Sequence, residues 1–296
     1  MSLGDVTDPK LDPNAGLNLA RNPKLSRVAT YRRKIGASLE RVWENVLDWE
    51  HLPWLHSRSF ADIACHDAGG WGWRAEVIYP PNPGSPDDDR RSEIELLTDR
   101  EAGRYVTRVL TGPGSGGEVW TTLERTGERE TGIVVEFWLK VPSGTDAETL
   151  GKGYLGLYSM LWDEDETMMQ HRQAELDRGE KQSSVTDRPD AIELGTLSEV
   201  RSRLPLALDA FGARMRIVEI DGDWILYSVT CPHTRGPLDE GEIIDGEVTC
   251  PWHGYRFDLK TGRSCDGRHL RLGRPARLSV DADADRVRLL RTGADS

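Results

Sequence analysis

The sequence predicts an α+β protein in which a large antiparallel sheet with one long helix is followed by a small all-β domain. Three observations lead to this prediction. Strand-like runs separated by turn signals fill most of the first half of the chain. A stretch with helical spacing follows at roughly 147–178, and residues 191–296 return to short β-rich runs. A chain of 296 residues is long enough for two domains with cores of their own.

The first ordered elements are expected to be a strand and a helix. Residues 27–37 suit a strand, and Ser38 has the position of a helix N-cap. Apolar residues recur at helical spacing over 39–49, so we expect an amphipathic helix there. Pro53 should end this helix or begin a second short one.

Six further strands are expected before the long helix. Turn-forming segments such as PPNPG and GPGSGG separate them. The expected strands are 59–66, 71–79, 91–98, 103–110, 117–124 and 132–140.

Three other segments complete the expected organisation. Residues 1–26 are rich in Asn, Pro and Asp and are expected to form an arm. We predict a first domain over 27–178 and a polar linker over 179–190. The small all-β domain over 191–296 should turn at DGD (221–223) and KTG (260–262).

The composition argues against some partners and suggests a compartment. The formal net charge is −12, which disfavours nucleic acid or an anionic membrane as a partner. No apolar run is long enough to span a bilayer, and the first residues, MSLGDVTDPK, lack the pattern of a signal peptide. The four Cys show no disulfide pattern, so a reducing, cytoplasmic setting is expected.

The strongest motif lies within residues 231–254, CPHTRGPLDEGEIIDGEVTCPWHG. It pairs Cys231 with His233 and Cys250 with His253. Thiolate and imidazole ligands bind either iron or zinc, so the residue types alone leave the metal open. Each half carries one Cys and one His, which suits two irons, one held by both Cys and the other by both His. The alternative is four unrelated residues in a turn-rich surface loop.

This stretch closely resembles the signature of the Rieske family. Pro232, Pro251, Gly254, Tyr255 and Phe257 match the positions around the ligands. The resemblance implies a [2Fe-2S] cluster held by Cys231, His233, Cys250 and His253. The other two cysteines, Cys65 and Cys265, are expected to be small core residues.

A second motif lies in residues 44–56, ENVLDWEHLPWLH. It contains Glu44, Asp48, His51 and His56 in the spacing Glu-x3-Asp-x2-His-x4-His. Two His and one carboxylate on one face of Fe(II) leave positions open for dioxygen and a substrate. Asp48, three residues before His51 on a predicted helix, could orient its imidazole ring. The alternative is that these His residues are solvent-exposed or fill the core.

The second motif resembles the catalytic domain of Rieske non-haem iron oxygenases, which has a helix-grip fold. The resemblance implies that His51 and His56 bind a mononuclear Fe(II) and that Asp48 is the electron-transfer bridge from a Rieske histidine. It also implies a third ligand on the long helix, for which Asp165 is the candidate. Its neighbours Asp163, Glu164 and Glu166 and the nearby His171 are rivals, and a solvated acidic helix face is the alternative.

Together these resemblances imply a Rieske-type mono- or dioxygenase with the catalytic domain first, the reverse of the usual order. A ferredoxin or flavin-dependent reductase would supply electrons, an apolar or aromatic small molecule would be hydroxylated or demethylated, and a homotrimer or other homo-oligomer is expected. The alternative is a non-catalytic Rieske electron-transfer protein fused to a hydrophobic-ligand-binding or cyclase-like helix-grip domain.

Overall fold

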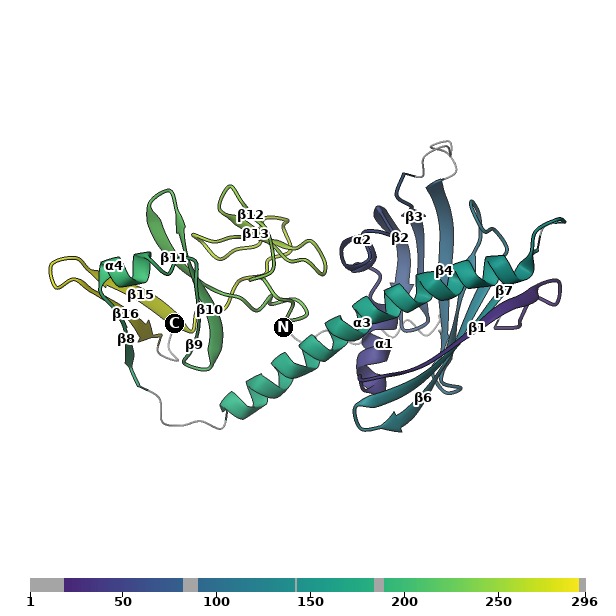
Figure 1. Ribbon diagram of the computed structural model, residues 1–296, viewed down its shortest axis with the longest axis horizontal. Helices are drawn as coiled ribbons and strands as arrows, with labels where there is room; N and C mark the ends of the chain where they lie inside the picture. Colours follow the sequence, from purple (N-terminus) through teal and green to yellow (C-terminus); the bar gives the residue numbers. More distant parts are fainter. Residues whose placement is uncertain (1–18, 82–89, 142, 184–188, 293–296) are drawn as a thin grey trace, which may run out of the picture. The chain divides into compact units, whose positions relative to one another are not determined.

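The chain divides into two compact units, Met1–Met169 and Gln170–Ser296 (Figure 1). This computed structural model describes residues 19–81, 90–141, 143–183 and 189–292. The first unit contains one large sheet with helices against it, and the second contains short strands in three small sheets. Most of the expected N-terminal arm, residues 1–18, lies outside the described residues.

The large sheet has the strand order β1-β7-β6-β5-β4-β3-β2, and every neighbouring pair is antiparallel. Strand β7 shows why these runs form strands, because buried and half-buried residues alternate along its whole length. Ile133, Val135 and Phe137 are on its core face. The bounds are β1 Ser26–Ile35, β2 Asp62–Gly69, β3 Gly72–Ile78, β4 Arg91–Asp99, β5 Arg104–Val109, β6 Glu118–Gly127 and β7 Glu130–Leu139.

Two short helices, α1 (Leu39–Leu47) and α2 (Leu52–Leu55), connect β1 to β2. The side chain of Ser38 accepts a hydrogen bond from the backbone N–H of Arg41, which confirms the predicted N-cap. The indole Nε1 of Trp73 in β3 donates to the backbone carbonyl of Val46 at 3.1 Å. This buried hydrogen bond attaches the last turn of α1 to the sheet.

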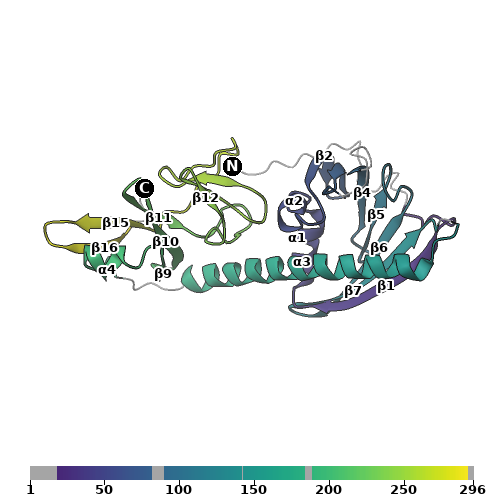
Figure 2. The same cartoon turned by 45° about the horizontal axis from the view of Figure 1, so that its top comes forward.

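The long helix α3 spans Ala147–Ser183, and in the first unit it lies along the sheet (Figures 1 and 2). Tyr154, Tyr158, Trp162 and Met169 of this helix pack into the core of the first unit. The ring of Tyr158 meets that of Phe137 edge to face, with centroids 4.7 Å apart. The predicted helix-grip arrangement, an antiparallel sheet packed on one long helix, is confirmed.

Some element boundaries differ from those that the sequence predicts. Strand β2 begins at Asp62, because the backbone N–H groups of Ser59 and Phe60 donate to the carbonyl of His56 and continue the turn after α2. Helix α3 continues to Ser183, so the first residues of the expected linker are helical. Helix α1 ends at Leu47, two residues earlier than predicted.

Residues just before β1 lie on the outer face of the large sheet. The guanidinium carbon of Arg21 lies 4.1 Å from the ring centroid of Trp138, and the same side chain pairs with Glu136 at 2.9 Å. The backbone N–H of Asn22 donates to Glu118. These contacts hold the last part of the expected arm against β6 and β7.

The second unit is built from three three-stranded sheets, ordered β11-β10-β9, β12-β13-β14 and β15-β16-β8. The predicted turn at 221–223 joins β10 to β11, and Asp221 and Gly222 both have positive φ there. A cluster around Phe211, Met215 and Leu289 forms its core. The bounds are β8 Ala191–Gly195, α4 Leu197–Arg201, β9 Leu206–Ala210, β10 Ala213–Ile220, β11 Asp223–Ser228, β12 Ile243–Ile244, β13 Glu247–Thr249, β14 Arg256–Asp258, β15 Ala276–Asp281 and β16 Arg286–Arg291.

Among the described helices, none combines the length and the apolar character that crossing a bilayer requires.

Candidate metal centres

The two histidines of the second motif flank helix α2. His51 is the residue before the helix and His56 is the residue after it, and Pro53 lies in its first turn. Both imidazoles are buried, with exposed fractions of 3% and 2%. Their ring centroids are 5.1 Å apart. The short helix therefore brings both rings to one side of the chain.

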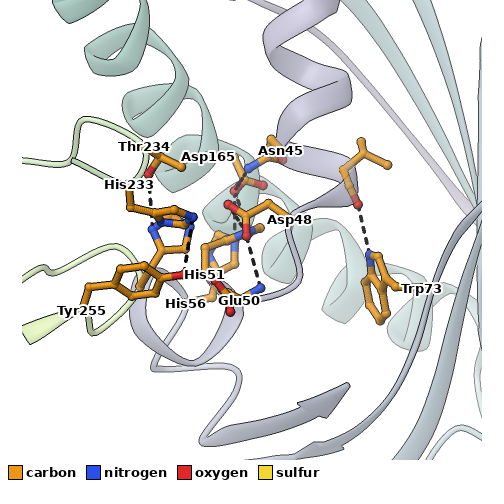
Figure 3. Close-up of polar contacts among 12 residues, drawn as sticks. Asn45, Asp48, Glu50, His51, His56, Trp73, Asp165, His233, Thr234 and Tyr255 are labelled. Carbon is orange, nitrogen blue, oxygen red and sulfur yellow. Dashed lines mark hydrogen bonds and ion pairs between the residues drawn. The ribbon is translucent and has the colours of Figure 1, made fainter. Parts of the chain in front are cut away.

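Asp165 of α3 completes this centre (Figure 3). Its Oδ1 lies 3.0 Å from Nε2 of His56 and 3.5 Å from Nε2 of His51. One ligand atom from each of the three residues lies within 4.8 Å of the others. The side chains thus present two imidazole nitrogens and one carboxylate oxygen at one point, the donor set that holds many divalent metals.

A further carboxylate lies behind each histidine. Glu164 Oε2 is 2.6 Å from Nδ1 of His56, and Asp48 Oδ2 is 3.8 Å from Nδ1 of His51. The side-chain amide of Asn45 donates to Asp165 Oδ1 at 2.9 Å. Such partners fix the tautomer and orientation of a metal-binding imidazole and increase its basicity.

The electrostatics of the centre reflect these contacts. Burial opposes protonation of His51, but the neighbouring carboxylates of Asp165 and Asp48 outweigh this effect and raise its pKa to about 10. Burial likewise opposes ionisation of Asp165, yet hydrogen bonds from His51 and His56 hold the pKa of its carboxyl well below the usual range. His51 and Asp165 therefore each favour the charged form of the other.

The acidic run 163–166 divides between two partners. Asp163 and Glu166 both pair with Arg33 of β1, and Glu166 also accepts from the backbone N–H of Gly36. Glu164 and Asp165 face the histidines instead. Arg33 therefore occupies the two outer carboxylates of the run.

One expectation about the second motif needs correction. Asp48 and His51 do not share a helix, because α1 ends at Leu47 and Asp48 has an extended conformation at its C-cap. The Asp48 side chain instead accepts from the backbone N–H of Glu50 in the connecting turn. Glu44 is 42% exposed and pairs with Arg41.

His171, the rival ligand, lies in the second unit. Its ring meets that of Trp252 edge to face, with centroids 5.1 Å apart. In the described part of the chain, the group of three close ligand atoms in the first unit does not include it.

The centre opens onto a small, mostly apolar pocket of about 130 Å³ in the first unit. Asp48, His51, His56 and Asp165 form its polar part. Its apolar walls include Leu52, Phe60, Trp73, Ile94, Leu96 and Trp162. A pocket with apolar walls and few convergent polar groups is typical of a small-molecule site.

The sequence does not predict the roles of two residues of the centre, Glu164 and Asn45. The sequence suggests Glu164 only as a rival ligand, yet it is the hydrogen-bond partner of His56. Asn45 gave one usable signal, an amide among the apolar positions of an amphipathic helix, where a buried polar group needs a partner.

The four residues of the first motif lie on two loops with the same backbone pattern. In each loop the Cys N–H donates to the carbonyl five residues later, Cys231 to Gly236 and Cys250 to Tyr255. The Cys carbonyl accepts from the residue four positions on, Arg235 or Gly254, and both of these have φ of +66°. The two loops therefore share these backbone hydrogen bonds, while the His follows the Cys by two residues in the first loop and by three in the second.

The ligand side chains gather between these loops. Cys231 and Cys250 are free, buried thiols that share a hydrogen bond. That bond raises the pKa of Cys231 and lowers the pKa of Cys250, which is also stabilised as thiolate by His253. The rings of His233 and His253 have centroids 4.6 Å apart. The Oγ1 of Thr234 lies 3.4 Å from Nδ1 of His253 (Figure 3).

The space beside the thiols fits a cluster held closely by backbone. A Cβ placed on Gly236 would lie 2.8 Å from Cys250 Sγ and 3.1 Å from the ring of Trp252. Such contacts are too short for a side chain, so Gly236 keeps room for the sulfur and whatever it binds. Two buried thiols and two adjacent imidazoles are the donor set of a Rieske centre.

We predict that Gly236→Ala lowers the cluster content of the purified protein. The added methyl group would push Cys250 or Trp252 out of place, at a cost on the order of 1–3 kcal/mol, which corresponds to roughly fivefold to 150-fold weaker cluster retention. Visible absorbance per chain measures this. Gly273→Ala is the matched control, since its Cβ would meet nothing within 4 Å, and equal cluster content in both variants would contradict the prediction.

Comparison with known proteins agrees with the ligand pattern. The Rieske [2Fe-2S] domain family matches residues 190–271. The C-terminal part of this chain is a Rieske domain. It implies a [2Fe-2S] cluster, for which Cys231, His233, Cys250 and His253 are the candidate ligands, and it links the chain to oxidoreductases through this domain.

Relatives match within the same region. The ferredoxin component of the p-cumate 2,3-dioxygenase system of Pseudomonas putida is 36% identical over 55 residues, which are 18% of this chain and 47% of that protein. The oxygenase component of dicamba O-demethylase from Stenotrophomonas maltophilia is 40% identical over 50 residues, 17% of this chain and 14% of that protein. The matched region spans less than half the length of both relatives.

Comparison with solved structures also gives a match of low overall score. A START superfamily protein from Mycobacterium smegmatis is 13% identical, covers 49% of this chain and 98% of its own, and gives a TM-score of 0.39. The described sheet and long helix, together with the family match, place a helix-grip unit before a Rieske domain along the chain.

Proposed function

We propose that the protein is a Rieske-type oxygenase whose first unit holds a mononuclear Fe(II) at His51, His56 and Asp165. One observation carries the proposal. The Nε2 atoms of two buried histidines converge on one carboxylate oxygen, and each Nδ1 is backed by another carboxylate. Two His and one carboxylate are the ligand set of non-haem Fe(II) oxygenases, and a Rieske domain on the same chain supplies electrons.

The residues of the first unit would divide the work among them. An Fe(II) held by His51, His56 and Asp165 would supply the chemistry of dioxygen activation. Glu164 and Asn45 hold His56 and Asp165 in place through their hydrogen bonds. Asp48, next to His51 Nδ1, is the proposed electron-transfer bridge. The apolar walls of the pocket exclude water and bind the substrate.

The partners follow from the Rieske domain and the pocket. A ferredoxin or flavin-dependent reductase would reduce the cluster, and the substrate would be a small apolar or aromatic molecule that is hydroxylated or demethylated. Its reacting part must fit the pocket of about 130 Å³. The free, unpaired state of all four cysteines supports a reducing, cytoplasmic setting, and a homotrimer or other homo-oligomer remains the expected assembly.

A second candidate is a non-catalytic Rieske electron-transfer protein. The sequence matches fall in the Rieske domain, and the apolar pocket of the first unit could bind a hydrophobic ligand without chemistry, or serve a cyclase-like reaction. In that case Asp165 and the two histidines would be a buried polar network without a metal.

The iron content distinguishes these candidates. We expect three irons per chain after anaerobic reconstitution, two in the cluster and one at His51, His56 and Asp165. Elemental analysis gives the total, and visible absorbance gives the share in the cluster. Iron that saturates at two per chain would overturn the oxygenase proposal and favour electron transfer alone.

A further inference from the structure

A column of three side chains ends on one of the cluster ligands. The ring of Tyr255 stacks on that of His233, with centroids 4.3 Å apart and planes 19° from parallel. The guanidinium carbon of Arg268 lies 4.2 Å from the centroid of the same Tyr255 ring. The Tyr255 hydroxyl is also 3.5 Å from Nε2 of His233 (Figure 3). Arg268, Tyr255 and His233 form what we call the His233 stack.

Asp266 holds Arg268 in this position. Its Oδ2 pairs with Nη1 of Arg268 at 2.7 Å, and its Oδ1 accepts from the Arg268 backbone N–H at 3.2 Å. The carboxylate is well covered, with a side-chain exposed fraction of 17% against 43% for Arg268. Gly267 between them has φ of +76°, which lets the chain turn back so that both contacts form. A fixed cation is thus attached to the outer end of the stack.

Such a cation acts on the redox equilibrium of the cluster. Reduction takes one electron from a donor and adds one negative charge to the iron centre beside His233. Net charge and nearby hydrogen bonds are among the factors that set the potential of an iron–sulfur cluster. Tyr255 is 5% exposed, so a buried aromatic ring rather than water separates the guanidinium from the imidazole. The positive charge therefore favours the reduced state.

We propose that Arg268, held by Asp266 on the ring of Tyr255, raises the reduction potential of the cluster through His233. Arg268 would act through Tyr255 and His233 and is not itself one of the proposed cluster ligands. The proposal rests only on the cluster of the Rieske domain. Its test therefore does not depend on whether the first unit binds a mononuclear iron.

The test is a spectroelectrochemical titration of the full-length, cluster-loaded chain at low ionic strength. We expect Arg268→Gln to lower the reduction potential, because it removes the cation. Asp266→Asn should raise it, because it removes the compensating anion. Arg268→Lys keeps the charge and should remain closer to the unmodified chain than Arg268→Gln. The shifts should shrink as salt is added, since part of the interaction runs through solvent.

Arg286→Gln is the matched control. Like Arg268, Arg286 pairs with a carboxylate, that of Glu193 at 3.0 Å. It lies on strand β16 and is not part of the His233 stack. The reduction potential of the cluster in Arg286→Gln should equal that in the unmodified chain. Shifts of the same sign in Arg268→Gln and Asp266→Asn, or shifts no larger than the control, would overturn the proposal. If Arg268→Gln failed to retain its cluster, the sign of the shift in Asp266→Asn would decide.

Discussion

Replacing both His51 and His56 with Ala is expected to remove one iron per chain and abolish substrate-dependent oxygen consumption, while the visible spectrum of the Rieske cluster stays unchanged. The two imidazoles supply two of the three ligand atoms of the proposed site, and Asp165 Oδ1 is the third. One remaining carboxylate oxygen and the amide of Asn45 cannot hold a divalent metal firmly. The proposed cluster ligands lie on two loops of the second unit, and the substitutions do not change those loops.

The double variant also affects folding, because the buried carboxylate of Asp165 loses both of its imidazole partners. Breaking a buried ion pair from one side typically costs about 3–5 kcal/mol, so circular dichroism must confirm a folded chain before iron is counted. His66→Ala is the matched control, since His66 pairs with Glu93 on the sheet and is 48% exposed. Turnover of substrate by the folded double variant would show that the ligand assignment is wrong.

Cys250→Ser is expected to abolish the visible spectrum of the cluster and to lower the iron content by two per chain. The Cys250 thiol is completely buried and shares a hydrogen bond with Cys231, so the two sulfurs lie ready for one iron. A serine oxygen is a harder ligand and leaves that iron poorly held. The mononuclear site in the first unit should still bind its iron.

The two other cysteines provide controls for this experiment. Cys65 contacts the carbonyl of Asp67 and Cys265 that of Arg263, and both are partly exposed. Cys65→Ser and Cys265→Ser should therefore keep the full cluster spectrum. A Cys250→Ser protein with an unchanged spectrum would mean that the cluster is held elsewhere.

The fold was largely predictable because its signals are local. Alternation along β7, the N-cap at Ser38 and the turn at Asp221 each depend on a few neighbouring residues. The break between α1 and α2 was harder to place. The end of α1 depends on the hydrogen bond from Trp73, which is far away in the sequence.

The centre in the first unit was predictable to the level of residue types but not of contacts. Four consecutive carboxylates look alike in a sequence, and which of them faces the histidines depends on Arg33, a residue of the first strand. The role of Glu164 and the stack of Arg268 on Tyr255 likewise depend on contacts between distant residues. Only tertiary structure supplies such information.

The contact between His56 and Asp165 spans 109 positions of the chain. A metal held there would therefore close a loop that contains β2 to β7, much as a covalent cross-link does. Closing a loop of this length removes conformational entropy from the unfolded chain worth about 4–5 kcal/mol in the simplest chain model. Iron bound there would therefore also stabilise the helix-grip unit, and its free energy of unfolding would rise with the concentration of free iron.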